Sequence, residues 1–210
     1  CNQVTSYIRS LIRKGTLEIG APVKEAVLSE QLGISRAPIR EALQVLVQEG
    51  LITSEPQKGK HVRQMTGKEI YDSYVVAGIL EGAGVAESLP LWTEANMETF
   101  RSVVRQMEGK ISYATKLDEL AEIDELFHAT LFMACDNTRL VEMARTSCAT
   151  ISKYLYYQHW ITMFTPREYA DRHHAVAEAV YSRDVKHVET ALRDHYKETG
   201  LRMAQFGKEA

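Results

Sequence analysis

The first third of the chain carries short runs of helically spaced apolar residues, and a glycine follows each run. Apolar side chains recur every three or four positions over residues 3–14, 24–32 and 35–49, which predicts three helices. Two strand-like runs follow at 51–54 and 61–63 around a turn that contains lysine and glycine, which predicts a hairpin. The expected order is helix, helix, helix, hairpin.

From residue 66 onward the pattern is helical throughout. Thr66 and Glu69 have the spacing of a capping box at the start of a long helical run. The predicted helices of this part cover residues 67–89, 93–113, 116–134, 138–158, 166–182 and 184–205. The sequence thus predicts a mainly α protein, in which three helices and a β-hairpin over 1–65 precede an all-helical bundle over 66–210.

Composition and charge narrow the class of protein. Hydrophobic residues make up 45% and charged residues 25%, no apolar run approaches the roughly 18 residues of a membrane span, and the three cysteines form no CxxC pair. These features predict a cytoplasmic protein with no membrane partner. Residues 1–65 carry nine Lys or Arg and six Asp or Glu, out of 25 and 28 in the chain, so the remainder carries 16 and 22. A basic front part on an acidic back part fits a DNA-binding module, although chance alone produces imbalances of this size.

The segment 30–43 has the order of a helix-turn-helix. Gly33 ends a short helix, Ser35 is a suitable N-cap, and Pro38 falls in the first turn of the next helix. The N-terminal end of that second helix can enter the major groove of DNA. Arg36 and Arg40 lie four residues apart on one helical face, where either can pair with guanine or bind phosphate.

The hairpin would form a wing beside this reading helix. Lys58, Lys60 and His61 are predicted at its tip, and Gly59 allows the backbone to approach the duplex closely. The residues alone leave a second interpretation open, in which this part is a plain three-helix subdomain with solvated arginines.

Four residues in the helical part have the chemistry of a metal site. Asp124 and His128 are four apart on one predicted helix, and His173 and His195 lie on two later helices. One carboxylate and three imidazoles suit a divalent ion such as Zn, Ni or Fe, with one or more positions left for water or ligand. A pair with this spacing is also common as a surface or capping pair, so the residues alone leave both interpretations open.

The front part resembles the winged-helix domain of GntR-family bacterial regulators over about residues 3–65. The resemblance rests on Pro-Ile-Arg-Glu-Ala-Leu, preceded by Gly-Ile-Ser-Arg and followed downstream by Glu-Gly-Leu-Ile. It implies that Ser35, Arg36, Arg40 and Gly59 contact operator DNA, and that the protein is a homodimer on a near-palindromic site. Many members carry a further DNA-contacting Arg in the second helix, where this chain has Ala26.

The helical part resembles the FCD domain of FadR-like GntR regulators over about residues 67–206. The resemblance rests on Asp-x-x-x-His, on a later His followed by Ala-Val-Ala-Glu-Ala-Val, and on a His near the end of the last helix. Its register selects His173 over His174 as a ligand. It implies a metal bound by Asp124, His128, His173 and His195, which helps to hold a small carboxylate effector.

One position departs from that resemblance. Many FCD domains carry an Arg four residues before the Glu of their first helix, and this chain has Ala77 there. A carboxylate effector would lose a bidentate partner. Either the effector is less acidic than usual, or another cation takes this role, for which Arg145 and Lys153 are the candidates. The aromatic-rich stretch around Tyr154 is expected to be mostly core, with one or two residues in a pocket wall.

The expected function is a DNA-binding transcription regulator, a repressor whose effector binds at the metal. The alternatives are a metal sensor in which the ion is the signal, a purely structural metal site, and a metalloenzyme. The enzyme is disfavoured because Glu122 and Glu125, the nearest candidate bases, are rotated away from the face of Asp124 and His128.

Overall fold

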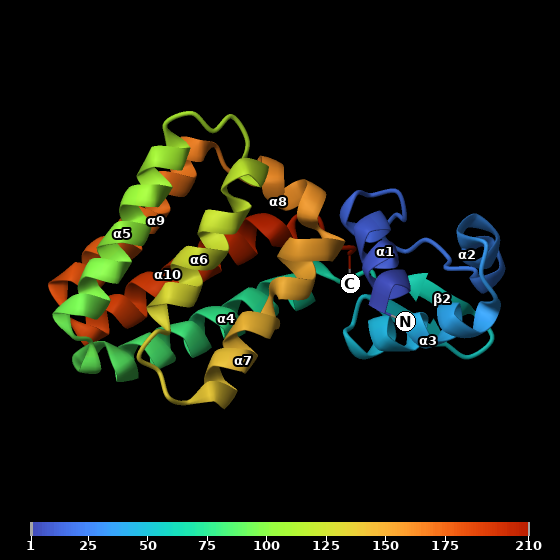
Figure 1. Cartoon of the computed structure of the whole chain (residues 1–210), viewed down its shortest axis with the longest axis horizontal. Helices are drawn as coiled ribbons and strands as arrows, with labels where there is room; N and C mark the ends of the chain where they lie inside the picture. The colour runs from blue at the N-terminus through green and yellow to red at the C-terminus, as the bar shows by residue number, and fades with distance from the viewer. Residues whose placement is uncertain (1, 210) are drawn as a thin grey trace.

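The computed structural model describes residues 2–209, and its N-terminal part has the predicted order of elements (Figure 1). The elements are α1 (Asn2–Arg13), α2 (Glu25–Leu32), α3 (Arg36–Gln48), β1 (Ile52–Glu55) and β2 (Gly59–Val62). The two strands pair antiparallel, from Ile52 opposite Val62 to Glu55 opposite Gly59. Three helices and a hairpin over this part confirm the predicted fold class.

Helices also make up the rest of the described chain. They are α4 (Gly67–Ser88), η1 (Leu89–Leu91), α5 (Glu94–Ile111), η2 (Leu117–Leu120), α6 (Ala121–Leu131), α7 (Thr138–Ser147), η3 (Ile151–Leu155), α8 (Tyr157–Met163), α9 (Pro166–Ser182) and α10 (Val185–Ala204). Thr66 and Glu69 form the expected capping box at the start of α4, with the Thr66 amide 2.7 Å from the Glu69 carboxylate.

Local chemistry explains where the reading helix begins and ends. Gly33 ends α2 with φ of 65°, and Gly50 follows α3 with φ of 72°, a left-handed conformation that favours glycine. Ser35 is the N-cap residue of α3, as expected, but its side chain makes no capping hydrogen bond. The buried side of α3 is apolar, and its residues are Ile39, Ala42, Leu43 and Leu46.

The single helix predicted over 138–158 is wrong. Helix α7 ends at Ser147, and the chain then passes through the π-helical turn η3 before α8 begins at Tyr157. A π turn shifts the phase of the side chains that follow it. Within this turn Ile151 and Leu155 are buried, while Lys153 is half-exposed. A search for a regular 3.6-residue period cannot detect such a shift.

The two parts of the chain share buried apolar contacts. Ile8 and Ile12 of α1 belong to the same buried cluster as Ile151 and Leu155 of η3. A second cluster fills the centre of the helical part and includes Phe100, which is fully buried. Figure 1 shows α1 next to the segment that contains α8. The segment 151–163 therefore contacts the N-terminal part directly.

Close packing of α4 on α10 brings their polar side chains together. A Cβ atom on Gly78 would lie 2.9 Å from the Cβ of Tyr196, and one on Gly200 would lie 2.7 Å from the Cβ of Tyr74. Only glycine allows this approach. It places Glu81 of α4 within hydrogen-bond distance of Tyr196.

One stretch of the described chain, Gly67–Leu91, is long and apolar enough to cross a membrane by length and composition, because a window of 18 residues within it has a mean hydropathy of 1.2. Half of that window is buried inside the protein, as in the core helix of a soluble protein, so the stretch is weak evidence for a membrane span.

Candidate functional site

A cavity of about 920 Å³ lies inside the helical part. Side chains from α4, α6, α7, η3, α8, α9 and α10 line it. Arg13, the last residue of α1, also lines it, so the N-terminal part contributes to its wall.

The four candidate metal ligands come together at this cavity. His128 of α6, His173 of α9 and His195 of α10 each offer a ring nitrogen, and these atoms all lie within 4.8 Å of one another. Asp124 lies one turn before His128, and its Oδ1 atom is 3.1 Å from His173 Nε2. The spacing that suggested these residues in the sequence thus corresponds to proximity in three dimensions.

The hydrogen bonds around two of the imidazoles suit a cation between them. His173 Nδ1 lies 2.8 Å from the carbonyl oxygen of Tyr169, so a neutral ring donates there and leaves a lone pair on Nε2. That lone pair faces the Asp124 carboxylate. Two acceptors at 3.1 Å need a proton or a metal ion nearby. His128 Nδ1 lies 2.6 Å from Glu81 Oε1, which leaves its Nε2 available as a ligand.

Charge and burial set the protonation of the cluster. Burial acts to raise the pKa of Asp124, but the interaction with His173 and the charge of His128 outweigh this and hold that pKa below its usual value. Burial lowers the pKa of His173 and that of His195. Burial also acts to lower the pKa of His128, but the charge and hydrogen bond of Glu81 raise it to about 9. An ionised Asp124 and neutral His173 and His195 are the forms that bind metal.

The sequence analysis missed Glu81 as a site residue. Its side chain is only 4% exposed; besides contacting His128, it accepts a hydrogen bond of 2.8 Å from the Tyr196 hydroxyl at Oε2. The available signal was a carboxylate in an otherwise apolar stretch of α4. Such a group is rarely buried without a partner.

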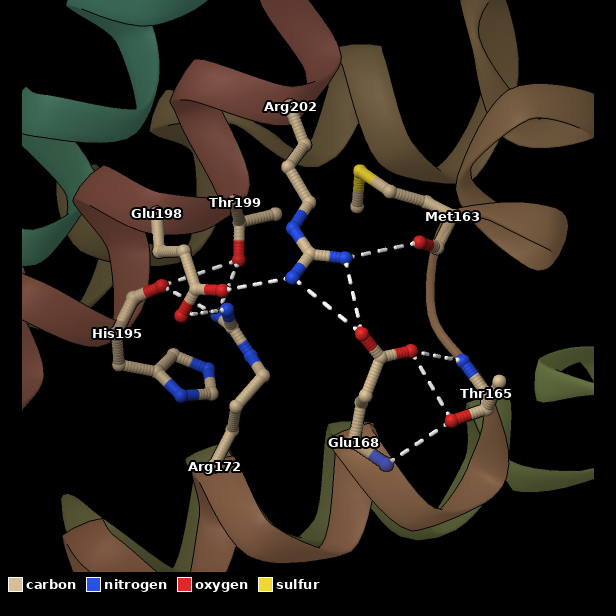
Figure 2. A network of polar contacts seen from close by, with 8 residues as sticks. All are labelled: Met163, Thr165, Glu168, Arg172, His195, Glu198, Thr199 and Arg202. Carbon is tan, nitrogen blue, oxygen red and sulfur yellow. Dashed lines mark hydrogen bonds and ion pairs between the residues drawn. The ribbon is translucent and has the colours of Figure 1, made fainter.

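Arg172 was also missed, although it directly precedes His173. Its Nη2 atom donates to the His195 carbonyl oxygen and to Thr199 Oγ1, at 2.6 Å each, and Nη1 pairs with Glu198 (Figure 2). The side chain is 11% exposed and lines the cavity. Helical spacing gave no signal for it, because neighbouring helix residues point about 100° apart.

A second arginine ties the same region to the ends of two helices. Arg202 Nη1 lies 3.3 Å from the Met163 carbonyl oxygen and 3.3 Å from Glu168 Oε1, and Nη2 lies 3.1 Å from Glu198 (Figure 2). Glu168 in turn forms a capping box with Thr165 at the start of α9. The network links the end of α8 and the start of α9 to α10, and so holds one side of the cavity.

All three candidate effector-binding residues line the cavity, namely Arg145, Lys153 and Tyr154. Lys153 Nζ lies 2.9 Å from Glu125 Oε1, and its side chain is half-exposed. His174 does not belong to the cluster; it is 38% exposed and pairs with Glu108 at 3.2 Å.

The candidate DNA-contacting residues lie on α3 and the hairpin. Ser35, Arg36, Arg40, Lys58 and Gly59 are exposed, and Gly59 has φ of 85°.

The expected position of the other two hairpin residues is corrected. Lys60 and His61 lie on β2, half-buried, whereas the turn itself spans residues 56–58. The side chain of Lys60 is held away from the tip because Glu25 Oε1, on α2, lies 3.1 Å from its Nζ atom.

The comparisons with known proteins agree with both resemblances. The model of the gntR family of bacterial regulatory proteins matches residues 1–62, and that of the FCD domain matches residues 72–198. The chain is 26% identical over 210 residues to the HTH-type transcriptional repressor RspR of Escherichia coli, covering 99% of this chain and 90% of that protein. It is 29% identical over 136 residues to the gluconate operon transcriptional repressor of Bacillus subtilis, covering 65% and 55%.

A solved structure has the same fold. Escherichia coli McbR/YncC superposes with a TM-score of 0.70 at 20% identity, covering 97% of this chain and 96% of that one. The matched families and relatives are transcriptional regulators and not enzymes. The chain therefore belongs to the GntR family of bacterial regulatory proteins, as a transcriptional regulator in which an FCD domain follows the winged helix.

Proposed function

We propose that this regulator is a cytoplasmic, homodimeric repressor whose operator affinity is controlled by a small effector bound at a metal site. The metal is a divalent ion of the Zn, Ni or Fe class, held by Asp124, His128, His173 and His195. The observation that carries the proposal is the convergence of three imidazoles and a carboxylate on one cavity of about 920 Å³. Four ligands of this type leave room for an effector atom on the ion.

The rest of the cavity supports an oxygen-rich effector such as a carboxylate. Arg172 lines it beside the imidazoles, and Arg145 and Lys153 line it as well. Two further residues of the wall, Tyr74 and Tyr169, carry buried hydroxyls. Cations and hydroxyl donors are the groups that bind carboxylate oxygens. Because one relative is named for a gluconate operon, gluconate is a reasonable first probe.

The wall formed by α1 offers a route from the cavity to the DNA. Arg13 Nη2 lies 2.6 Å from the Tyr157 hydroxyl and 3.7 Å from Asp118 Oδ1, and Gln158 Nε2 donates to the Arg13 carbonyl oxygen at 2.8 Å. An anionic effector would compete with Asp118 for this guanidinium. Occupancy of the cavity would thereby shift α1 relative to the segment 151–163 and change the spacing of the two winged helices.

The remaining parts of the proposal concern DNA and the partner chain. Operator contacts would come from Ser35, Arg36, Arg40, Lys58, Gly59, Lys60 and His61, within a domain that ends near residue 65. A second copy would pack on the exposed apolar side of α4. Val76 and Ile79, three residues apart on this helix, are 45% and 40% exposed. Burying such a face is the usual basis of a stable dimer.

Elemental analysis of untagged protein tests the metal site. Wild type is compared with His173→Ala and with the matched control His174→Ala, all purified without added metal or chelator. About one divalent ion per chain is expected in wild type and in the control, and a clear loss in His173→Ala. Equal metal content in all three proteins, or none in wild type, would overturn the site.

Two alternative roles of the metal site, a metal sensor and a purely structural site, can be distinguished by experiment. If the ion itself is the signal, dialysis against chelator changes operator affinity without any organic ligand. If the site is only structural, His173→Ala lowers the melting temperature but leaves the response to effector intact.

A further inference from the structure

Glu25, in the first turn of α2, contacts both of the elements that face DNA. Its Oε2 atom lies 3.3 Å from Arg40 Nη2 and 3.4 Å from Arg40 Nε, on the reading helix. Its Oε1 atom lies 3.1 Å from Lys60 Nζ, on the hairpin. A single carboxylate therefore holds one cation from each element, and it does so in a region where the partner to be bound is a polyanion.

Two of the three side chains in this contact are largely buried, and the third is exposed. The side chains of Glu25 and Lys60 are 23% and 22% exposed, and that of Arg40 is 61% exposed. Lys60 is thus largely committed to Glu25, whereas Arg40 can leave it by rotating towards solvent.

The other cations of this surface are placed differently. Arg36 has no ion pair within the part of the chain that the structure describes, and its side chain is exposed. Lys58 pairs with Glu55 at 2.8 Å within the exposed turn, where such pairs exchange easily with solvent ions. Glu25 is the carboxylate that joins the helix and the hairpin.

We propose that Glu25 sets the sequence discrimination of this regulator by withholding Arg40 and Lys60 from phosphates on non-operator DNA. The inference rests on the proposed role of α3 and the hairpin in DNA binding. Non-specific binding is driven by cations that neutralise phosphates and release counterions. Two cations already neutralised by a carboxylate release fewer counterions, and the Glu25 charge itself repels the backbone.

At an operator, Arg40 has a base as an alternative partner to Glu25. The fork of N–H donors on Arg40 can form two parallel hydrogen bonds with O6 and N7 of a guanine, which replace both of its contacts with Glu25. A phosphate can also accept two hydrogen bonds from Arg40, but this contact only exchanges one anionic partner for another and is the same at every sequence. Glu25 therefore weakens binding to every sequence, but it weakens binding least where the correct base is present.

The test compares the full-length wild type with Glu25→Gln and with Glu30→Gln. Glu30 is on the same helix, exposed and without an ion pair within the described residues. The control Glu30→Gln therefore removes the same charge as Glu25→Gln without releasing a cation. Binding to a random-sequence duplex of about 30 base pairs is measured as a function of salt. An operator is first obtained with wild type by selection from a random library.

Glu25→Gln is expected to steepen the slope of log K against log salt on the random duplex by about one to two units, since each released cation contributes about 0.9. Its non-specific affinity should rise roughly tenfold near physiological salt, while affinity for the operator changes less, so the ratio of the two falls. Adding Arg40→Ala to Glu25→Gln should reverse about half of the gain in slope.

Two results would overturn the inference. One is a slope and affinity for Glu25→Gln equal to those of Glu30→Gln. The other is a loss of affinity for both duplexes together with a lower melting temperature, which would make Glu25 a structural tie. A wild type that selects no operator at all would instead refute the proposed reading surface, so the two failures are distinguishable.

Discussion

The buried contact between Glu81 and His128 leads to a prediction that needs neither effector nor operator. Replacing Glu81 by Gln keeps the shape of the side chain but removes its charge. In the wild type, Glu81 Oε1 lies 2.6 Å from His128 Nδ1, and the two side chains are 4% and 16% exposed. The charge of Glu81 should therefore act on His128 with little screening by solvent.

The size of the effect follows from the pKa of His128. Burial acts to lower it, but Glu81, with a further contribution from the charge of Asp124, outweighs burial and raises the pKa from 6.5 to about 9. A group with a raised pKa in the folded state stabilises the fold fully below its unfolded pKa, and that contribution is lost as the pH rises through about 9. A shift of about 2.5 units corresponds to roughly 3 kcal/mol, as an order of magnitude.

The assay is urea unfolding of chelator-treated protein at about pH 6 and about pH 9.5, with Glu87→Gln as an exposed control on the same helix. Wild type and control should lose roughly 3 kcal/mol more than Glu81→Gln between the two pH values. Zinc affinity at neutral pH should also fall about 10- to 100-fold in Glu81→Gln, because the carboxylate orients the imidazole. Identical pH dependence in all three proteins would refute the reasoning.

Two further changes test the domain coupling and the dimer. Arg13→Ala should keep operator binding but reduce the change in operator affinity that a bound carboxylate causes, whereas Lys14→Ala, next to it and exposed, should respond like wild type; an unaltered response in Arg13→Ala would exclude this route. Ile79→Glu places a charge on the exposed face of α4 and should yield monomers in sedimentation, while Leu91→Glu, at 67% exposure, should not; a dimeric Ile79→Glu would place the interface elsewhere.

Local sequence determined the order of elements and most of their ends. Gly33 and Gly50 stop α2 and α3 because their backbones are left-handed, and Thr66 starts α4 through a capping box. These signals act over a few residues, so they can be read from the chain alone. The four candidate ligands were also visible, since Asp124 and His128 share a helical face and the family register selected the other two.

Only the tertiary structure decided which distant polar groups meet. Glu81 reaches His128 from 47 positions away, and Glu25 reaches Lys60 across 35. The π turn at Ile151–Leu155, whose two buried side chains share an apolar cluster with residues of α1, likewise had no signal in the local spacing. Helical periodicity reports which face of one element is apolar, whereas contacts between charges depend on how those faces pack. The chemistry of this protein was therefore readable from its residues, and the partners that tune that chemistry emerged only from the packing.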